Sequence, residues 1–206
     1  MKEHRLRPWL RQLSRQFPGF VAHKRLLLKA PVNGSLKAVV FESSAADKDS
    51  FYIWYFVMPM CIPQDYISLL FGDRLRHPTE REYWTSSMPD LVDHIASAIQ
   101  EQALPMLTIA GSPEGFINLA KRAWRNPHTP HAVASVLARS GRYKEALIVI
   151  DDFLPRLNTA APAEKEIFDL STRLRDLLID DPAAALRQLQ EWENYTIGKL
   201  GLQAYR

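Results

Sequence analysis

His128, His131 and Cys61 have the side-chain types that metal or nucleophilic chemistry needs. The two histidines form an H-x-x-H pair in the proline-broken stretch NPHTPH. Zinc takes three or four convergent ligands, and the sequence places no cysteine or further ligand beside this pair. We therefore expect no metal site.

Cys61 is the only cysteine and stands between Met60 and Ile62. A nucleophilic cysteine needs a neighbouring base and an electropositive environment, whereas these neighbours are apolar. We expect a small buried hydrophobe. A single cysteine excludes an internal disulfide framework, which favours a reducing, cytoplasmic compartment. The first residues lack the apolar run of a secretory signal, so we expect no export.

Paired acids are the other candidates for acid–base chemistry, namely Asp151-Asp152, Asp180-Asp181 and Glu164 with Glu166. Asp180-Asp181 stands directly before a proline, where aspartate caps a helix, and the two glutamates fit the first turn of a helix. The chain has no phosphate-binding glycine loop, nucleophile elbow or zinc-protease motif. These observations predict a non-catalytic protein without a cofactor.

Basic residues are concentrated near the start of the chain. Residues 1–29 hold eight Lys or Arg and one acid, although the formal charge of the whole chain is only +3. Arg7, Arg11 and Arg15 are spaced for one side of a helix, and Lys24 and Arg25 follow them. Such a face binds an acidic protein or a phosphate backbone, or is a solvated surface. We expect a protein partner, with nucleic acid as the alternative.

A polar loop over 72–87 contains a second set of candidate partner-binding residues, Arg74, Tyr83 and Trp84. Arginine, tyrosine and tryptophan are enriched among the residues that dominate protein interfaces. In the alternative interpretation, Tyr83 and Trp84 fold back over a sheet and belong to the core.

Hydrophobic periodicity predicts an α+β first region. An apolar side opposite the arginines predicts a helix that ends before Pro18-Gly19. Strands are expected over 20–29, 36–43 and 51–58, with a hairpin turn at Asn33-Gly34. Short turns between consecutive strands make this an antiparallel meander. Helices are expected over 64–72 and 89–103.

The stretch FYIWYFVM, residues 51–58, is apolar on both sides of the expected strand. An antiparallel strand with one wet face alternates apolar and polar residues. We therefore expect both faces of this strand to be covered. The stretch is much shorter than the roughly 20 apolar residues of a membrane-spanning helix, so no membrane interaction is expected.

From residue 112 onward the periodic segments are helical. This change of class predicts an α+β domain over 1–110 and a helical domain over 111–206. The turn GRYKEA, residues 141–146, resembles that of a tetratricopeptide repeat, in which glycine permits the tight turn between helices. Asn158 stands where that repeat has a proline, and an isolated helical hairpin with similar turn chemistry is the alternative.

The first 118 residues also resemble an uncharacterised bacterial domain family of unknown function. The matching features are Gly19-Phe20 after the first helix, Pro59 and Pro63 after the apolar strand, the turn Phe71-Gly72-x-Arg74-Leu75, the pair Tyr83-Trp84, and Leu104-Pro105-x-Leu107. Members of such families are often small, non-catalytic and encoded beside toxin genes as candidate immunity proteins. The resemblance implies that this chain neutralises a bacterial toxin domain by binding it.

Overall fold

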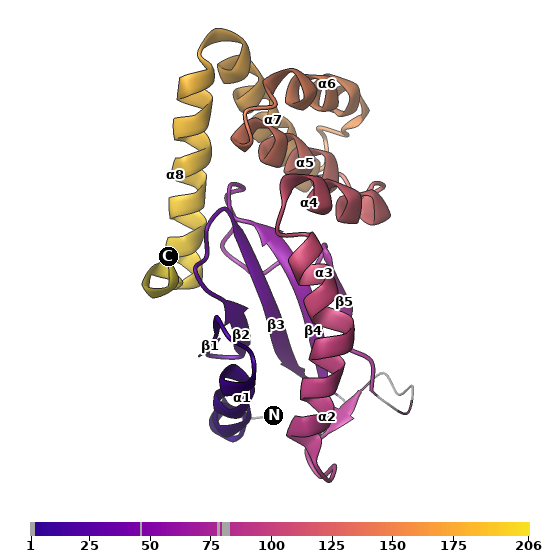
Figure 1. Ribbon diagram of the computed structural model, residues 1–206. Helices are drawn as coiled ribbons and strands as arrows, with labels where there is room; N and C mark the ends of the chain where they lie inside the picture. The colour runs from indigo at the N-terminus through magenta and orange to yellow at the C-terminus, as the bar shows by residue number, and fades with distance from the viewer. Residues whose placement is uncertain (1–2, 46, 78, 80–82) are drawn as a thin grey trace. The chain divides into compact units, whose positions relative to one another are not determined.

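The chain forms two compact units in a computed structural model that describes residues 3–45, 47–77, 79 and 83–206 (Figure 1). Unit 1 comprises residues 1–58, 68–111 and 204–206. Unit 2 comprises residues 59–67 and 112–203. The predicted domains, 1–110 and 111–206, are each a single stretch of sequence. In the structure, the segment 59–67, residue 111 and the last three residues belong to the other unit from the one that this prediction gives them.

Unit 1 contains an antiparallel sheet covered by helices, which confirms the predicted α+β class. The strands β1 to β5 are neighbours in chain order, and β6 pairs with the start of β4. Their bounds are Phe20–His23 (β1), Leu26–Lys29 (β2), Ser35–Ser43 (β3), Ser50–Pro59 (β4), Gly72–Arg74 (β5) and Trp84–Thr85 (β6). The predicted meander is therefore present, with more strands than expected.

Two predictions about this region were wrong in detail. The strand expected over 20–29 is the hairpin of β1 and β2, because the chain turns at Lys24, whose φ is 50°. No helix forms in the described segment 64–72. Gly72 instead opens β5, which packs so closely on β4 that a Cβ atom at this position would lie 2.6 Å from the carbonyl oxygen of Tyr55.

One face of β4 is largely dry. Phe51, Ile53 and Val57 are at most 1% exposed, and Tyr55 on the same face is half-buried. Helix α1 (Glu3–Gln16) covers this face, because the ring of Trp9 lies 5.7 Å from that of Phe51. Helix α1 also packs on β1, β2 and α2. The apolar side of α1 is therefore part of the core of unit 1.

The opposite face of β4 is covered only in its second half. Phe56 and Met58 are buried there, whereas Tyr52 and Trp54 are half-buried. The guanidinium of Arg74 lies over the rings of Tyr52 and Trp54, 4.5 and 4.9 Å from their centroids. The prediction that both faces are covered is thus confirmed for the end of the strand and only partly for its start.

A long helical rod completes unit 1 (Figure 1). It consists of α2 (Leu91–Ala98), the π-helical segment η1 (Ile99–Ala103) and α3 (Leu104–Ile109). The rod continues past residue 103, where the predicted helix ended. It buries one row of apolar side chains, Leu91, Ile95, Ile99, Ala103 and Leu107.

Unit 2 is helical apart from its first segment and its turns. Its elements are α4 (Pro113–Ala120), η2 (Lys121–Ala123), α5 (His128–Arg139), α6 (Tyr143–Phe153), η3 (Leu154–Arg156), α7 (Pro162–Asp180) and α8 (Pro182–Leu200). The last element, η4 (Gln203–Tyr205), begins at the end of unit 2 and continues into unit 1. The predicted cap before Pro182 is confirmed, because the side chain of Asp181 accepts hydrogen bonds from the N–H groups of Ala183 and Ala184. Ser112 caps α4 in the same way and accepts a hydrogen bond from the N–H of Gly115.

Hydrogen bonds explain why the segments 59–67 and 204–206 belong to units whose other residues are distant from them in sequence. In unit 2, the hydroxyl of Thr196 on α8 donates to the carbonyl of Ile62 at 2.7 Å and accepts from the N–H of Gln64 at 3.0 Å. In unit 1, the carbonyl of Tyr205 accepts from the N–H of Val32 at 2.7 Å. These bonds fix segment 59–67 on α8 and the last residues beside the sheet.

Candidate functional site

Helix α1 separates an arginine side from an apolar side, as its spacing predicts. Arg7, Arg11 and Arg15 are exposed. Leu10 and Leu13, on the other side, are at most 1% exposed. The three arginines therefore lie on one accessible helix face.

The other predicted cationic residues occupy separate places in unit 1. Lys24 and Arg25 form the exposed turn between β1 and β2. Arg74 lies on β5, at the other end of the strand order. Adjacent strands are about 4.8 Å apart, so four strand spacings separate β5 from β1. The structure therefore does not bring Arg74 together with Lys24 and Arg25.

Trp84 is not a surface residue, which corrects its prediction as a partner-binding side chain. It is fully buried, and its indole N–H donates to the carbonyl of Leu75 at 3.1 Å. The register pairs Trp84 with Phe51, so its ring joins the dry face of β4. Tyr83 remains 40% exposed. Residues 78 and 80–82 of the predicted binding loop lie outside the described residues.

Cys61 is buried inside unit 2, as predicted. Burial raises the pKa of its thiol to about 12. Since only a thiolate is a competent nucleophile, the neutral thiol acts as an apolar group in the folded protein.

His128 and His131 do not belong to a metal-binding cluster within the described residues. His131 is 2% exposed, and its Nδ1 lies 2.8 Å from the hydroxyl oxygen of Ser171. Burial, with a smaller contribution from His128, lowers the pKa of His131 to about 4. The ring is therefore neutral near pH 7.

Gly141 makes the tight turn between α5 and α6 that its sequence context predicts. Its φ of 77° lies in the left-handed region that glycine adopts without strain. The N–H of Arg142 then donates to the carbonyl of Leu137 at 3.0 Å, and that of Gly141 donates to Ala138 at 3.0 Å. This pattern is a Schellman motif. It directs α6 back along α5 as an antiparallel hairpin.

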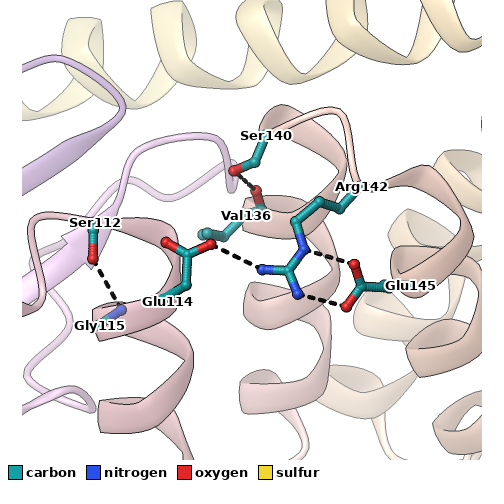
Figure 2. Close-up of polar contacts among 7 residues, drawn as sticks. All are labelled: Ser112, Glu114, Gly115, Val136, Ser140, Arg142 and Glu145. Atoms are coloured by element: carbon teal, nitrogen blue, oxygen red, sulfur yellow. Dashed lines mark hydrogen bonds and ion pairs between the residues drawn. The ribbon is translucent and has the colours of Figure 1, made fainter.

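Arg142 joins this turn to α4 (Figure 2). Its Nε and Nη2 atoms donate to the two carboxylate oxygens of Glu145 at 2.7 and 2.5 Å. Its Nη1 atom donates to Glu114 at 3.2 Å. The hydrogen bond from Arg142 lowers the pKa of Glu145, and the same bond raises the pKa of Arg142. Two carboxylates therefore hold one guanidinium in a fixed orientation.

An apolar groove lies beside this arginine. It has a volume of about 420 Å³ and is lined by Ile117, Lys121, Trp124, Val133, Leu137, Arg142, Glu145, Ile148 and Val149. Trp124 is 39% exposed and Ile148 is 68% exposed. We call this surface, formed by α4, η2, α5 and α6, the hairpin groove.

Sequence reasoning did not find the hairpin groove, although one signal for it was available. Ile148 follows Lys144 by four residues and precedes Asp152 by four, so it lies on the charged side of α6. An isolated isoleucine on a charged helix side has no core to enter. Trp124 lies in an irregular segment, where periodicity carries no information.

No protein-family model, curated protein or solved structure matches this chain. Within the described residues, none of the helices combines the length and the apolar character needed to cross a membrane.

Proposed function

We propose that this chain is a non-catalytic protein-binding module and that the hairpin groove of unit 2 receives apolar side chains of its partner. The exposure of Ile148 and Trp124 at the groove carries this proposal. Large apolar side chains gathered at a hollow lose water on binding, which is the main source of affinity at protein interfaces.

The charged side chains of the groove supply orientation. Lys121, Arg142 and Glu145 line it together with the apolar residues. Because Glu114 and Glu145 already fix Arg142, its guanidinium needs little further ordering when a partner docks. Fixed charges of this kind discriminate between partners more than they add affinity.

The resemblance of residues 1–118 to candidate immunity proteins makes the proposal more specific. The partner would be a bacterial toxin domain, and binding would block it. An acidic toxin domain would also be attracted by Arg7, Arg11 and Arg15 on α1, which increases the rate of encounter.

A site-specific photo-crosslink tests the groove. A photoreactive residue replaces Ile148 in the full chain in its native host, and the captured protein is identified by mass spectrometry. The matched control carries the same residue at Ile179, which is 54% exposed on α7 and outside the groove. We expect position 148 to capture one defined protein that position 179 does not.

The captured protein must then lose affinity for the purified Ile148→Asp variant but keep it for Ile179→Asp. Equal capture at both positions, or equal binding by both variants, would overturn the groove as the contact surface. Inhibition of the captured protein's toxicity on co-expression tests the immunity assignment separately.

Nucleic acid binding is the second candidate function, and the exposed arginine side of α1 favours it. It predicts retention on immobilised heparin and RNA with a steep fall in affinity as salt increases. The Arg11→Glu/Arg15→Glu variant would lose this retention. The Arg122→Glu/Arg125→Glu variant has the same charge change at exposed positions of unit 2 and would keep it. Equal retention of both variants would remove this candidate.

A further inference from the structure

A second cavity of unit 2 is separate from the hairpin groove. It lies among segment 62–66 and helices α5, α7 and α8 and has a volume of about 680 Å³. Pockets for small ligands typically measure roughly 300 to 1,000 Å³. The cavity shares no lining residue with the hairpin groove.

Acidic side chains predominate among the charged residues of this cavity. Asp65, Glu166 and Glu191 line it, whereas Arg173 is its single lysine or arginine. No ion pair engages Asp65 or Glu166 within the described part of the chain. The lining therefore favours a positively charged occupant.

Aromatic side chains surround the same space. Trp192 is 6% exposed, while Tyr66 and Tyr195 are 58% and 47% exposed. The ammonium of Lys199 already lies 5.3 Å from the ring centroid of Tyr195. This contact demonstrates that a cation can approach that ring, and aromatic rings attract ammonium and guanidinium groups through their faces.

Two residues that line the cavity each have a buried side-chain polar atom without a hydrogen-bond partner among the described residues. These atoms are Nε2 of His131, a residue that is 2% exposed, and Oε1 of Gln64. The contact between His131 Nδ1 and Ser171 fixes the ring, and the backbone bond of Gln64 to Thr196 fixes its segment. An unpaired buried polar atom is unfavourable, and the amide oxygen of Gln64 accepts only from a donor. A donor-rich ligand would satisfy it.

We propose that this cavity binds a guanidinium or ammonium group carried on an aliphatic stem. The carboxylates of Asp65 and Glu166 neutralise the charge, the aromatic rings enclose it, and Gln64 accepts one of its N–H bonds. Ile167 and Leu170 contact the stem. A free amine and an arginine side chain of a peptide share this chemistry.

Isothermal titration calorimetry on the full chain tests the proposal and distinguishes the two sources. The probes are agmatine, the capped peptide acetyl-Gly-Arg-Gly-amide, and the same peptide with neutral, isosteric citrulline in place of arginine. Binding of agmatine alone assigns the site to a free amine. Binding of the arginine peptide alone assigns it to a protein side chain, and binding of both assigns it to the shared group.

Charge-neutralising variants locate the site. We expect Glu166→Gln to weaken binding of the cationic probe about tenfold, because a charged hydrogen-bond acceptor is lost. Asp180→Asn removes the same charge from the same helix outside the cavity and leaves affinity unchanged. The proposal is overturned if neither cation binds, if the citrulline peptide binds as well as the arginine peptide, or if Glu166→Gln has no effect. None of these outcomes bears on the hairpin groove.

Discussion

Arg139 on α5 and Glu193 on α8 form an ion pair inside unit 2, with 2.6 Å between Nη2 and Oε2. The side chain of Glu193 is only 3% exposed, and that of Arg139 is 32% exposed. A buried carboxylate has lost its hydration, and the attraction of its positive neighbour offsets that cost. The pair therefore connects the helical hairpin to the last long helix.

Removal of one partner tests this dependence. We expect Arg139→Leu to lower the free energy of unfolding by about 3 kcal/mol, because the buried carboxylate of Glu193 loses its counter-charge. The double variant Arg139→Leu/Glu193→Leu removes that carboxylate as well and should recover part of the loss. Urea denaturation measures both variants. A double variant no more stable than Arg139→Leu would contradict this account.

The buried thiol of Cys61 makes stability fall at high pH. Its pKa is raised to about 12 in the folded protein, whereas an unfolded cysteine titrates near 8.5. Above the unfolded value, only the unfolded chain loses the proton. The stabilising contribution of Cys61 to the free energy of unfolding is therefore complete below about pH 8.5. It is lost as the pH rises towards 12, by up to about 1.4 kcal/mol per pH unit.

The Cys61→Ala variant isolates this contribution, since other groups also titrate at high pH. Its free energy of unfolding should fall less steeply than that of the parent chain above pH 9. A thiol reagent should label the parent chain only at the rate of unfolding. Rapid labelling under native conditions is incompatible with the buried position.

The neutral ring of His131 has the opposite pH dependence. Its pKa is lowered to about 4, whereas an unfolded histidine titrates near 6.5. As the pH falls below 6.5, the unfolded chain takes up a proton that the folded chain does not, so the free energy of unfolding decreases until about pH 4. Replacement by asparagine, which does not titrate, should reduce the slope between pH 6.5 and 4.5 by about 1.4 kcal/mol per unit. An identical slope in His131→Asn would assign the effect to other groups.

Two glycines are predicted to resist substitution for different reasons. A Cβ at Gly72 would lie 2.6 Å from the carbonyl oxygen of Tyr55 and 2.7 Å from the Cβ of Phe56. A Cβ at Gly141 would meet nothing within 4 Å, but the backbone there has a φ of 77°. We expect Gly72→Ala to cost about 1–3 kcal/mol through overpacking and Gly141→Ala to cost about 1–2 kcal/mol through backbone strain.

Asparagine separates the two mechanisms, because it tolerates the left-handed region better than alanine but is larger. Gly141→Asn should be more stable than Gly141→Ala, whereas Gly72→Asn should be no better than Gly72→Ala. Thermal unfolding of the four variants gives the comparison. The reverse order at either position would refute the corresponding mechanism.

Local chemistry explains which parts of the fold could be predicted from the sequence. Helix ends depend on hydrogen bonds between residues only a few positions apart, so they can be predicted from the local sequence. Examples are the beginning of α4 at Ser112, the end of α5 at Gly141 and the beginning of α8 at Asp181. The segment 64–72 has helical periodicity, but its backbone bonds go to α8 and β4 instead. Tertiary partners overrode the local preference.

The candidate site was less predictable for the same reason. The arginine side of α1 follows from spacing alone. Trp84 was ambiguous, because its burial depends on the pairing of β6 with β4 across a loop. The hairpin groove and the second cavity of unit 2 are each lined by side chains from several helices. No single stretch of sequence contains all the residues that line either of them.

The backbone passes from one unit to the other at 58–59, 67–68, 111–112 and 203–204. A fragment that ends at residue 111 therefore lacks the carbonyl of Tyr205 that accepts from Val32, and a fragment that begins at residue 112 lacks the stretch bound by Thr196. Neither unit is a single continuous stretch of sequence, so neither can be moved to another protein by one exchange of chain. Each unit therefore depends on residues from distant parts of one continuous chain, which joins the arginine-bearing helix α1 of unit 1 and the hairpin groove of unit 2 in a single polypeptide.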